Sequence, residues 1–221
     1  MQNIKAVIFD LDGLCLDTES AMLVIWTDVL NELGVKTPNF DKFFYAKCCG
    51  NGFGTAYARI KEHFNLTQST EEFLELINAR RRHHYNSKPP ALKPGLINLL
   101  TYLRANDYKA ALCTSSVKEI LDLKIEKSGL PIELFDAIIT GDMVKNMKPN
   151  PEPYLLACDV LGVKPSEAIA LEDSDVGLTS AYRAGCNAVL VPDMVQNGPQ
   201  AKKMATRIVK SLNDITPLLE N

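Results

Sequence analysis

The chain has 221 residues, a formal net charge of -3 and 46% hydrophobic residues, which is enough apolar material for one large domain or two modest ones. With no excess of basic residues, no apolar stretch of about twenty residues and no basic-then-apolar leader, the composition argues against nucleic-acid-binding, membrane and exported proteins. We therefore expect a cytoplasmic protein without nucleic-acid or membrane partners, and a monomer, with an oligomer left open.

The cysteines and histidines of the chain form no recognisable metal or disulfide pattern. The 6 cysteines include no Cys-x-x-Cys pair, and a chain of this length needs no disulfides for stability. The 3 histidines form neither a His-Glu-x-x-His motif nor a cluster with cysteine. We predict reduced thiols and no zinc site, which leaves oxygen ligands for a hard cation.

The first predicted element is a buried strand at residues 7–9, which is followed by Asp10, Asp12 and Gly13. Side chains two residues apart in an extended chain point to the same side, so the two carboxylates are expected to share one small space. Without a cation between them one pKa should rise, which would let one carboxylate act as a nucleophile while its neighbour carries a proton. The alternative is that both aspartates merely cap a strand–helix loop.

The next segment is predicted to be helical. Between Asp17, which could cap a helix, and Gly34, apolar residues recur at helical spacing. Residues 40–85 carry aromatic residues interspersed with charge and no strand-like apolar run, and Pro89 and Pro90 then break the chain. We predict a small helical domain inserted after the first strand.

Beyond these prolines, strand and helix patterns alternate. Short apolar runs predict strands at residues 110–113, 137–139, 168–171 and 188–191. Helical patterns separate them near residues 117–128, 151–162 and 175–184. This alternation predicts an α/β fold with a parallel sheet covered on both faces, in which ligands bind beyond the carboxyl ends of the strands. The predicted domains are a core at residues 1–16 and 87–221 and an inserted helical domain at residues 17–86.

Polar residues follow three of these strands: Thr114, Ser115 and Ser116, then Lys148, then Glu172 and Asp173. Each has an ordinary explanation as a helix cap, a surface lysine or a solvated acidic pair. Together with Asp10 and Asp12 they supply what phosphoryl transfer requires, namely a carboxylate nucleophile, an acid–base carboxylate, a hydroxyl, a cation and oxygen ligands suited to Mg²⁺.

The same residues form four motifs in chain order: Phe9-Asp10-Leu11-Asp12-Gly13, Leu112-Cys113-Thr114-Ser115, Lys148-Pro149 and Leu171-Glu172-Asp173. With these motifs the chain resembles the haloacid dehalogenase superfamily, in its β-phosphoglucomutase-like branch of phosphatases with a helical cap of the C1 type. The resemblance covers essentially the whole chain. It implies a Rossmann-like parallel sheet, an inserted four-helix cap, and a small phosphorylated metabolite as substrate, such as a sugar phosphate or a nucleotide-type monophosphate.

The resemblance also implies roles for the matching residues. Asp10 would attack phosphorus and form an aspartyl-phosphate, while Asp12 would protonate the leaving oxygen and then activate the hydrolytic water. The implied phosphate-binding residues are Thr114, Ser115 and Lys148. The implied Mg²⁺ ligands are the Asp10 carboxylate, the Asp12 main-chain carbonyl and Asp173, with Glu172 assisting directly or through water.

Residue 12 separates activities within this superfamily, because dehalogenases lack an aspartate there, transport ATPases have threonine, and phosphatases and phosphomutases keep Asp. Phosphomutases of this branch carry a histidine early in the first cap helix and an arginine in the next cap segment. Here Met22 stands at the first position and Lys47–Gly54 contains no arginine, which favours a phosphatase over the alternative of a sugar phosphomutase. A receiver-type phospho-acceptor module is a distant alternative, opposed by the acceptor's place on the first strand and by the cap.

The cap is expected to close over the site and to select the substrate. Candidate specificity residues are Glu19, Lys47, Asn51 and Phe53, although aromatic residues at such positions are more often packed in a cap's own core. The run Arg80-Arg81-Arg82 is interpreted as a solvated helix face.

Overall fold

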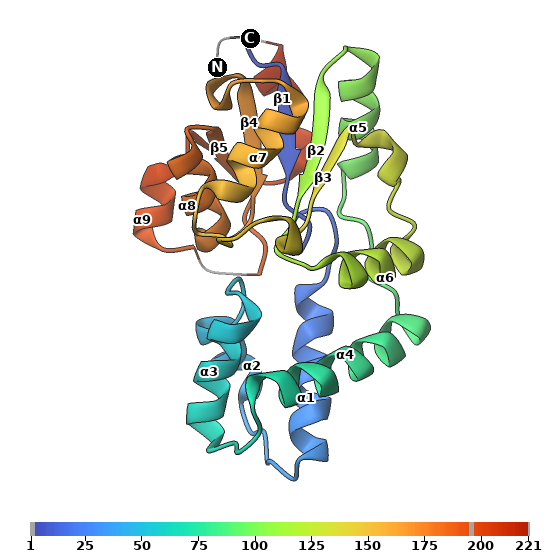
Figure 1. Cartoon of the computed structure of the whole chain (residues 1–221), viewed down its shortest axis with the longest axis vertical. Helices are drawn as coiled ribbons and strands as arrows, with labels where there is room; N and C mark the ends of the chain where they lie inside the picture. Colours follow the sequence, from blue (N-terminus) through green and yellow to red (C-terminus); the bar gives the residue numbers. More distant parts are fainter. Residues whose placement is uncertain (1–2, 195–196, 221) are drawn as a thin grey trace.

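A six-stranded parallel sheet is the centre of the larger part of the molecule in a computed structural model that describes residues 3–194 and 197–220 (Figure 1). In spatial order its strands are β3 (Ala137–Ile139), β2 (Lys109–Cys113), β1 (Ala6–Phe9), β4 (Ala168–Glu172), β5 (Asn187–Leu190) and β6 (Arg207–Ile208). The expected α/β fold with a parallel sheet is confirmed. Strand β6 was not expected from the sequence, because it is two residues long, exposed and without an apolar run.

The register of the central strands brings the motif residues to one edge of the sheet. Phe9 on β1 lies opposite Leu112 on β2 and Leu171 on β4. Since all three strands are parallel, the residues that follow these three positions leave the sheet together at its carboxyl edge.

Helices cover both faces of the sheet, and the strand residues alternate between two apolar clusters. Val7 and Phe9 face the cluster that contains α5 (Leu96–Ala105), while Ala6 and Ile8 face the cluster that contains α7 (Glu152–Leu161). On the α7 side lie also α8 (Asp175–Ala184) and α9 (Pro199–Met204), and on the α5 side lies α10 (Thr216–Leu219). Short 3-10 helices stand at Ile132–Leu134, Gly141–Met143, Pro165–Glu167 and Leu212–Asp214.

Four helices between β1 and α5 pack around a third cluster of their own. They are α1 (Glu19–Glu32), α2 (Phe40–Lys47), α3 (Phe53–Phe64) and α4 (Thr70–Ser87). At the centre of this cluster Trp26 contacts the rings of Phe44, Phe53 and Phe73, at centroid distances of 6.2, 5.4 and 5.3 Å. Because this unit buries its own aromatic side chains, it does not depend on the sheet for a core.

The four-helix unit lies beyond the carboxyl edge of the sheet, and the chain passes twice between the two parts (Figure 1). The two connecting segments are paired by backbone hydrogen bonds from Asp17 to Ala91 and from Lys93 to Cys15, at 2.9 and 2.8 Å. Helix α6 (Lys118–Ser128), which follows β2, contacts α4 across the gap. The region between the parts is thus bounded by strand ends, by α6 and by α4.

Within residues 3–194 and 197–220, none of the helices combines the length and the apolar composition required to cross a membrane.

Candidate active site

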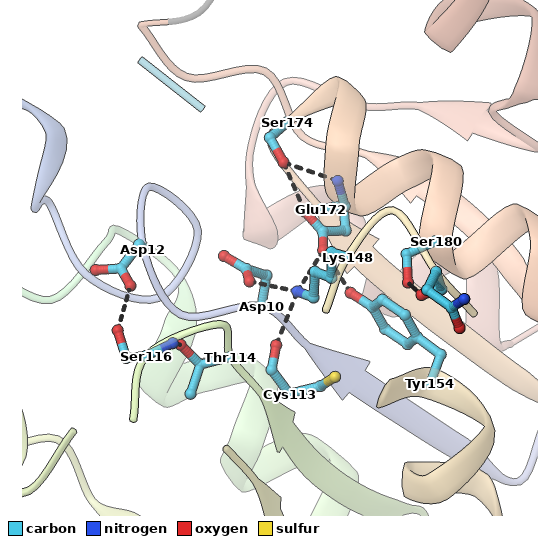
Figure 2. Close-up of polar contacts among 12 residues, drawn as sticks. Asp10, Asp12, Cys113, Thr114, Ser116, Lys148, Tyr154, Glu172, Ser174 and Ser180 are labelled. Atoms are coloured by element: carbon cyan, nitrogen blue, oxygen red, sulfur yellow. Dashed lines mark hydrogen bonds and ion pairs between the residues drawn. The ribbon is translucent and has the colours of Figure 1, made fainter. Parts of the chain in front are cut away.

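Asp10 and Lys148 form the centre of a buried ion-pair cluster at the carboxyl edge of the sheet (Figure 2). The Lys148 Nζ donates to Asp10 Oδ1 at 2.6 Å, to Glu172 Oε1 at 2.7 Å and to the Cys113 carbonyl at 2.9 Å. The lysine side chain is 5% exposed, so all three of its donors are used inside the protein. The ammonium therefore holds together groups contributed by β1, β2 and β4.

The electrostatics of this cluster are set by burial and by charge imbalance. Burial raises the pKa of Asp10 from 3.8 to about 7, and the charges of Glu172 and Asp12 add to this effect, because the opposing Lys148 charge offsets them only in part. Burial alone would lower the pKa of Lys148, but the charges of Asp10 and Glu172 outweigh it and raise that pKa well above its ordinary value. The site therefore keeps a fixed positive charge beside a carboxylate whose ionisation is incomplete at neutral pH.

Glu172 is held on all sides. It is fully buried, and its carboxylate accepts from Lys148, from the Tyr154 hydroxyl at 2.6 Å and from Ser174 Oγ at 3.3 Å. Gly177 of α8 packs against this carboxylate so closely that a Cβ there would collide with it. Glu172 is therefore positioned rigidly, with its oxygens already engaged by protein donors.

Asp173 differs from the other acidic residues of this cluster in its unsatisfied acceptor atom. It is 1% exposed, and its Oδ2 has no hydrogen-bond partner among the residues the structure describes. Burial and the charges of Asp10 and Glu172 raise its pKa well above the ordinary value. One carboxylate oxygen from each of these three residues lies within 4.8 Å of the other two.

This donor set fits a hard divalent cation. It consists of carboxylate oxygens, one of them buried and without a partner in the described part of the chain. It needs positive charge because burial disfavours three neighbouring anions. Gly13 adopts a φ of 86° next to it, and a Cβ at Gly13 would lie 2.2 Å from Asp173 Oδ2. The glycine thus leaves room beside the acidic group that another residue would fill.

Asp12 points away from this cluster, toward Ser116 (Figure 2). Both aspartates follow the end of β1 at Phe9 and line one cavity, as the i, i+2 spacing predicted, but their carboxylates have different partners. The Lys124 Nζ donates to both Asp12 carboxylate oxygens, at 2.6 and 2.7 Å, and to Ser116 Oγ at 2.8 Å. Burial opposes ionisation of Asp12, but the Lys124 charge more than offsets it, and the pKa of Asp12 is lowered.

Lys124 is absent from the sequence-based candidates. It lies on α6 and is 4% exposed. A signal was present, because Lys124 falls on the buried face of α6 with Ile120 and Leu121, where a lysine requires a partner. Nothing local identified that partner, which is 112 residues away in the chain.

The hydroxyl residues after β2 have different environments. Thr114 is 2% exposed, and its hydroxyl accepts a hydrogen bond from the Ser116 backbone N–H at 3.0 Å. Ser115 and Ser116 line a cavity of about 360 Å³ together with Asp10, Asp12 and Lys148, whereas Thr114 is not among its lining residues. The loop therefore offers serines at the cavity surface and a threonine that orders the turn behind them.

The wall of this cavity on the helical side contains three of the four candidate specificity residues, Glu19, Asn51 and Phe53. Glu19 accepts from the Cys49 thiol at 2.8 Å, and burial raises the pKa of the glutamate. Asn51 donates to carbonyls of its own loop, and Phe53 packs on Trp26. Lys47 is exposed and is not a lining residue.

Arg81 corrects the interpretation of the basic run on α4. Arg82 is exposed, as a solvated face requires, but Arg81 is 8% exposed and lines the cavity. The interpretation was wrong for Arg81 because one turn of α4 faces both solvent and the cavity, and three consecutive residues cannot share one side of a helix.

Comparison with known proteins places this geometry in a family. Residues 7–191 match the family described as haloacid dehalogenase-like hydrolase. A protein of Drosophila melanogaster named "Probable pseudouridine-5'-phosphatase" is 33% identical over 224 residues, covering 98% of this chain and 94% of that protein. A "Phosphorylated carbohydrates phosphatase" of Thermotoga maritima is 27% identical, with 98% and 90% of the two chains covered.

A solved structure agrees over nearly the whole length. CbbY from Rhodobacter sphaeroides, in complex with phosphate, matches with a TM-score of 0.81 at 26% identity, covering 96% of each chain. The names of the relatives confirm the expected enzyme class, a phosphoric monoester hydrolase. The four motifs, the parallel sheet and these similarities lead to one conclusion: the chain belongs to the haloacid dehalogenase-like hydrolase family.

Proposed function

We propose that the protein is a Mg²⁺-dependent phosphatase that hydrolyses a small phosphorylated metabolite through an aspartyl-phosphate. The observation that carries the proposal is the separation of two aspartates in one cavity. Asp10 is paired with Lys148 beside the acidic cluster, and Asp12 is paired with Lys124 on the other side. Two carboxylates in different electrostatic environments suit a nucleophile and an acid–base group.

In this mechanism Asp10 attacks phosphorus and the ester oxygen leaves toward Asp12, which supplies its proton. Lys148 stabilises the charge on the transferring group, together with hydrogen-bond donors of the Thr114–Ser116 loop. Asp12 then takes a proton from the water that hydrolyses the aspartyl-phosphate. Bound Mg²⁺, held by Asp10, Asp173 and the Asp12 carbonyl with Glu172 in support, would supply positive charge that favours ionised Asp10.

The four-helix unit would act as a cap that covers the reacting groups. We assign residues 17–86 to this cap and residues 1–16 and 87–221 to the core domain, with the paired connecting segments as hinges. The cap side of the cavity carries Trp26, Phe44 and Phe53, which would exclude water from the phosphoryl group. The small cavity and the names of the relatives support a small phosphorylated substrate.

A phosphate-release assay over a panel of phosphorylated metabolites, with Mg²⁺ and with EDTA, tests the proposal. Asp10→Asn should abolish turnover of every substrate, because an amide is not a nucleophile for phosphorus. Asp122→Asn is the matched control, since Asp122 is an exposed aspartate of α6 whose ion pair, among the residues described, is with Lys118. Full activity in D10N, or in EDTA after dialysis, would contradict the proposal.

A sugar phosphomutase is the second candidate, because the structure brings an arginine of the cap, Arg81, into the cavity. This candidate predicts isomerisation of a hexose 1-phosphate that a sugar bisphosphate stimulates. Phosphate release without any isomer excludes it.

A further inference from the structure

Helix α4 presents one polar face to the cavity. Leu74, Asn78, Arg81 and Tyr85 line the cavity, and their spacing of four, three and four residues places them in one row along the helix. The neighbouring row, with Phe73 and Ile77, packs in the core of the cap. The row that faces the cavity therefore combines a guanidinium and a phenol at positions where packing alone favours apolar side chains.

Arg81 is buried without full compensation. Its Nη1 donates to Asn78 Oδ1 at 2.5 Å and its Nη2 lies 3.7 Å from the Met22 sulfur, but its Nε has no partner among the described residues. No carboxylate lies within ion-pairing distance of it in the described part of the chain. A buried cation with an unused donor is costly unless a ligand completes its hydrogen bonds.

Tyr85 repeats this pattern one helical turn further on. It is 1% exposed, and its hydroxyl has no partner among the residues described. Burial and the charge of Asp12 raise its pKa, so the hydroxyl stays protonated and can donate. Arg81 and Tyr85 line the same cavity as Asp12, the carboxylate proposed to protonate the leaving oxygen.

We propose that Arg81 and Tyr85 form a subsite for the other hydroxyl groups of the leaving alcohol, and that they select a sugar-like alcohol over one whose single hydroxyl is the ester oxygen. This inference rests on the proposed function. Because the subsite lies on the α4 side of the cavity and the Asp10–Lys148 pair lies at the strand ends, a group bound at the subsite belongs to the alcohol and not to the transferred phosphoryl group.

The chemistry of the wall favours hydroxyls over a second phosphate. A hydroxyl both donates and accepts, and the wall offers a donor in Arg81, a donor and acceptor in Tyr85, and acceptors in Glu19. A second phosphate accepts only, and it would face the Glu19 carboxylate and an Asp12 carboxylate whose charge is already paired with Lys124.

Steady-state kinetics of Arg81→Met with two kinds of substrate test the inference. The substrates are the sugar phosphate that the panel shows to be hydrolysed best, and p-nitrophenyl phosphate. The leaving group of the second has no hydroxyl apart from the one that the ester oxygen forms. We expect kcat/KM for the sugar phosphate to fall about 10- to 100-fold, as for the loss of a charged hydrogen bond, and that for p-nitrophenyl phosphate to change less than about twofold. Tyr85→Phe should show the same selectivity with a smaller loss, and Arg82→Met, at an exposed neighbour on α4, should change neither value.

The outcomes separate this inference from the proposed function. Equal losses of kcat/KM for both substrates in R81M would mean that Arg81 is only structural, and no loss for either would mean that Arg81 does not bind the substrate. Each of these results overturns the inference and leaves the proposed phosphatase function intact. A wild-type preference for p-nitrophenyl phosphate over all sugar phosphates would also overturn the inference. A loss of kcat/KM in R81M that is confined to sugar bisphosphates would overturn it too, because it would assign Arg81 to a second phosphate. A wild-type protein inactive on all substrates would overturn the proposed function itself. Thermal melting of R81M and of Arg81→Lys excludes unfolding as the cause of any loss.

Discussion

The Lys124 ammonium contacts both carboxylate oxygens of Asp12, at 2.6 and 2.7 Å, from helix α6, which also contacts α4. The lysine side chain is 5% exposed and the Asp12 side chain 31%, so solvent reaches the pair only from the carboxylate side. A buried cation on an acid–base carboxylate stabilises its ionised form and fixes its orientation. Lys124 therefore controls both the charge and the position of the residue proposed to protonate the leaving group.

Replacing this lysine should change the pH dependence of catalysis. In Lys124→Met the lowered pKa of Asp12 should rise, because its largest favourable interaction is lost while burial remains. The acid form of Asp12 then persists to higher pH, so the alkaline limb of the kcat/KM profile for an alkyl phosphate moves to higher pH. A profile measured with Lys118→Met, which removes an exposed lysine of the same helix, should coincide with that of the wild type. An unshifted alkaline limb in K124M would contradict this role.

The titration of Asp10 should lower the free energy of unfolding of the metal-free protein as the pH rises. Its pKa is about 7 in the folded protein and 3.8 ordinarily, so folding favours the protonated form. The contribution of Asp10 to stability is fully present below pH 3.8 and is lost as the pH rises through about 7. Mg²⁺ competes with this proton, so it should raise the melting temperature more at pH 8 than at pH 5. At about 100 times its Kd, a ligand of the folded state stabilises by about 2.7 kcal/mol.

Differential scanning fluorimetry with Mg²⁺ and with EDTA at both pH values measures this effect. The Asp10→Asn variant should lose part of the difference between the two pH values, because it has no proton to displace at that position, while the buried Asp173, whose pKa is also raised, still binds one. An equal Mg²⁺ shift at pH 5 and pH 8 in the wild type would argue against Asp10 as a ligand.

Removing Lys148 should destabilise the fold. Lys148→Met leaves Asp10 and Glu172 buried without their shared cation, and breaking a buried ion pair in this way costs about 3–5 kcal/mol. Urea denaturation measures the loss, and Lys145→Met, at an exposed lysine of the same loop, should be neutral. Adding Glu172→Gln to K148M should recover part of the stability, since it removes one of the two buried carboxylates that K148M leaves without a cation.

Gly177 is required by the Glu172 carboxylate. In Gly177→Ala the new Cβ would overlap that carboxylate, and such overpacking costs about 1–3 kcal/mol. Gly54 of α3 is the matched control, because a Cβ there meets no atom within 4 Å. Gly54→Ala should therefore gain up to about 1 kcal/mol from helix propensity alone. Loss of phosphatase activity with unchanged urea stability in G177A would indicate displacement of Glu172 without unfolding.

Much of the core fold could be predicted from the sequence, because its signals are local. Strand β3 was expected at 137–139 and lies at Ala137–Ile139, and helix α8 was expected at 175–184 and lies at Asp175–Ala184. Apolar runs and glycine after the helix are sufficient there. Strand β6 has no such signal, because two exposed residues pair only where β5 offers its free edge.

The sequence by itself determined the α/β order of the sheet and several of the residues that meet at its carboxyl edge, because short apolar strands end directly in Asp10, Thr114, Glu172 and Asp173. Only the tertiary structure decided which lysine pairs with which aspartate, and which arginine of residues 80–82 lines the cavity. The physical reason is distance along the chain. Lys124 and Asp12 are 112 residues apart, and Arg81 approaches the core only because the cap lies over the strand ends. Such pairings depend on how two separately packed parts face each other, which no local pattern encodes.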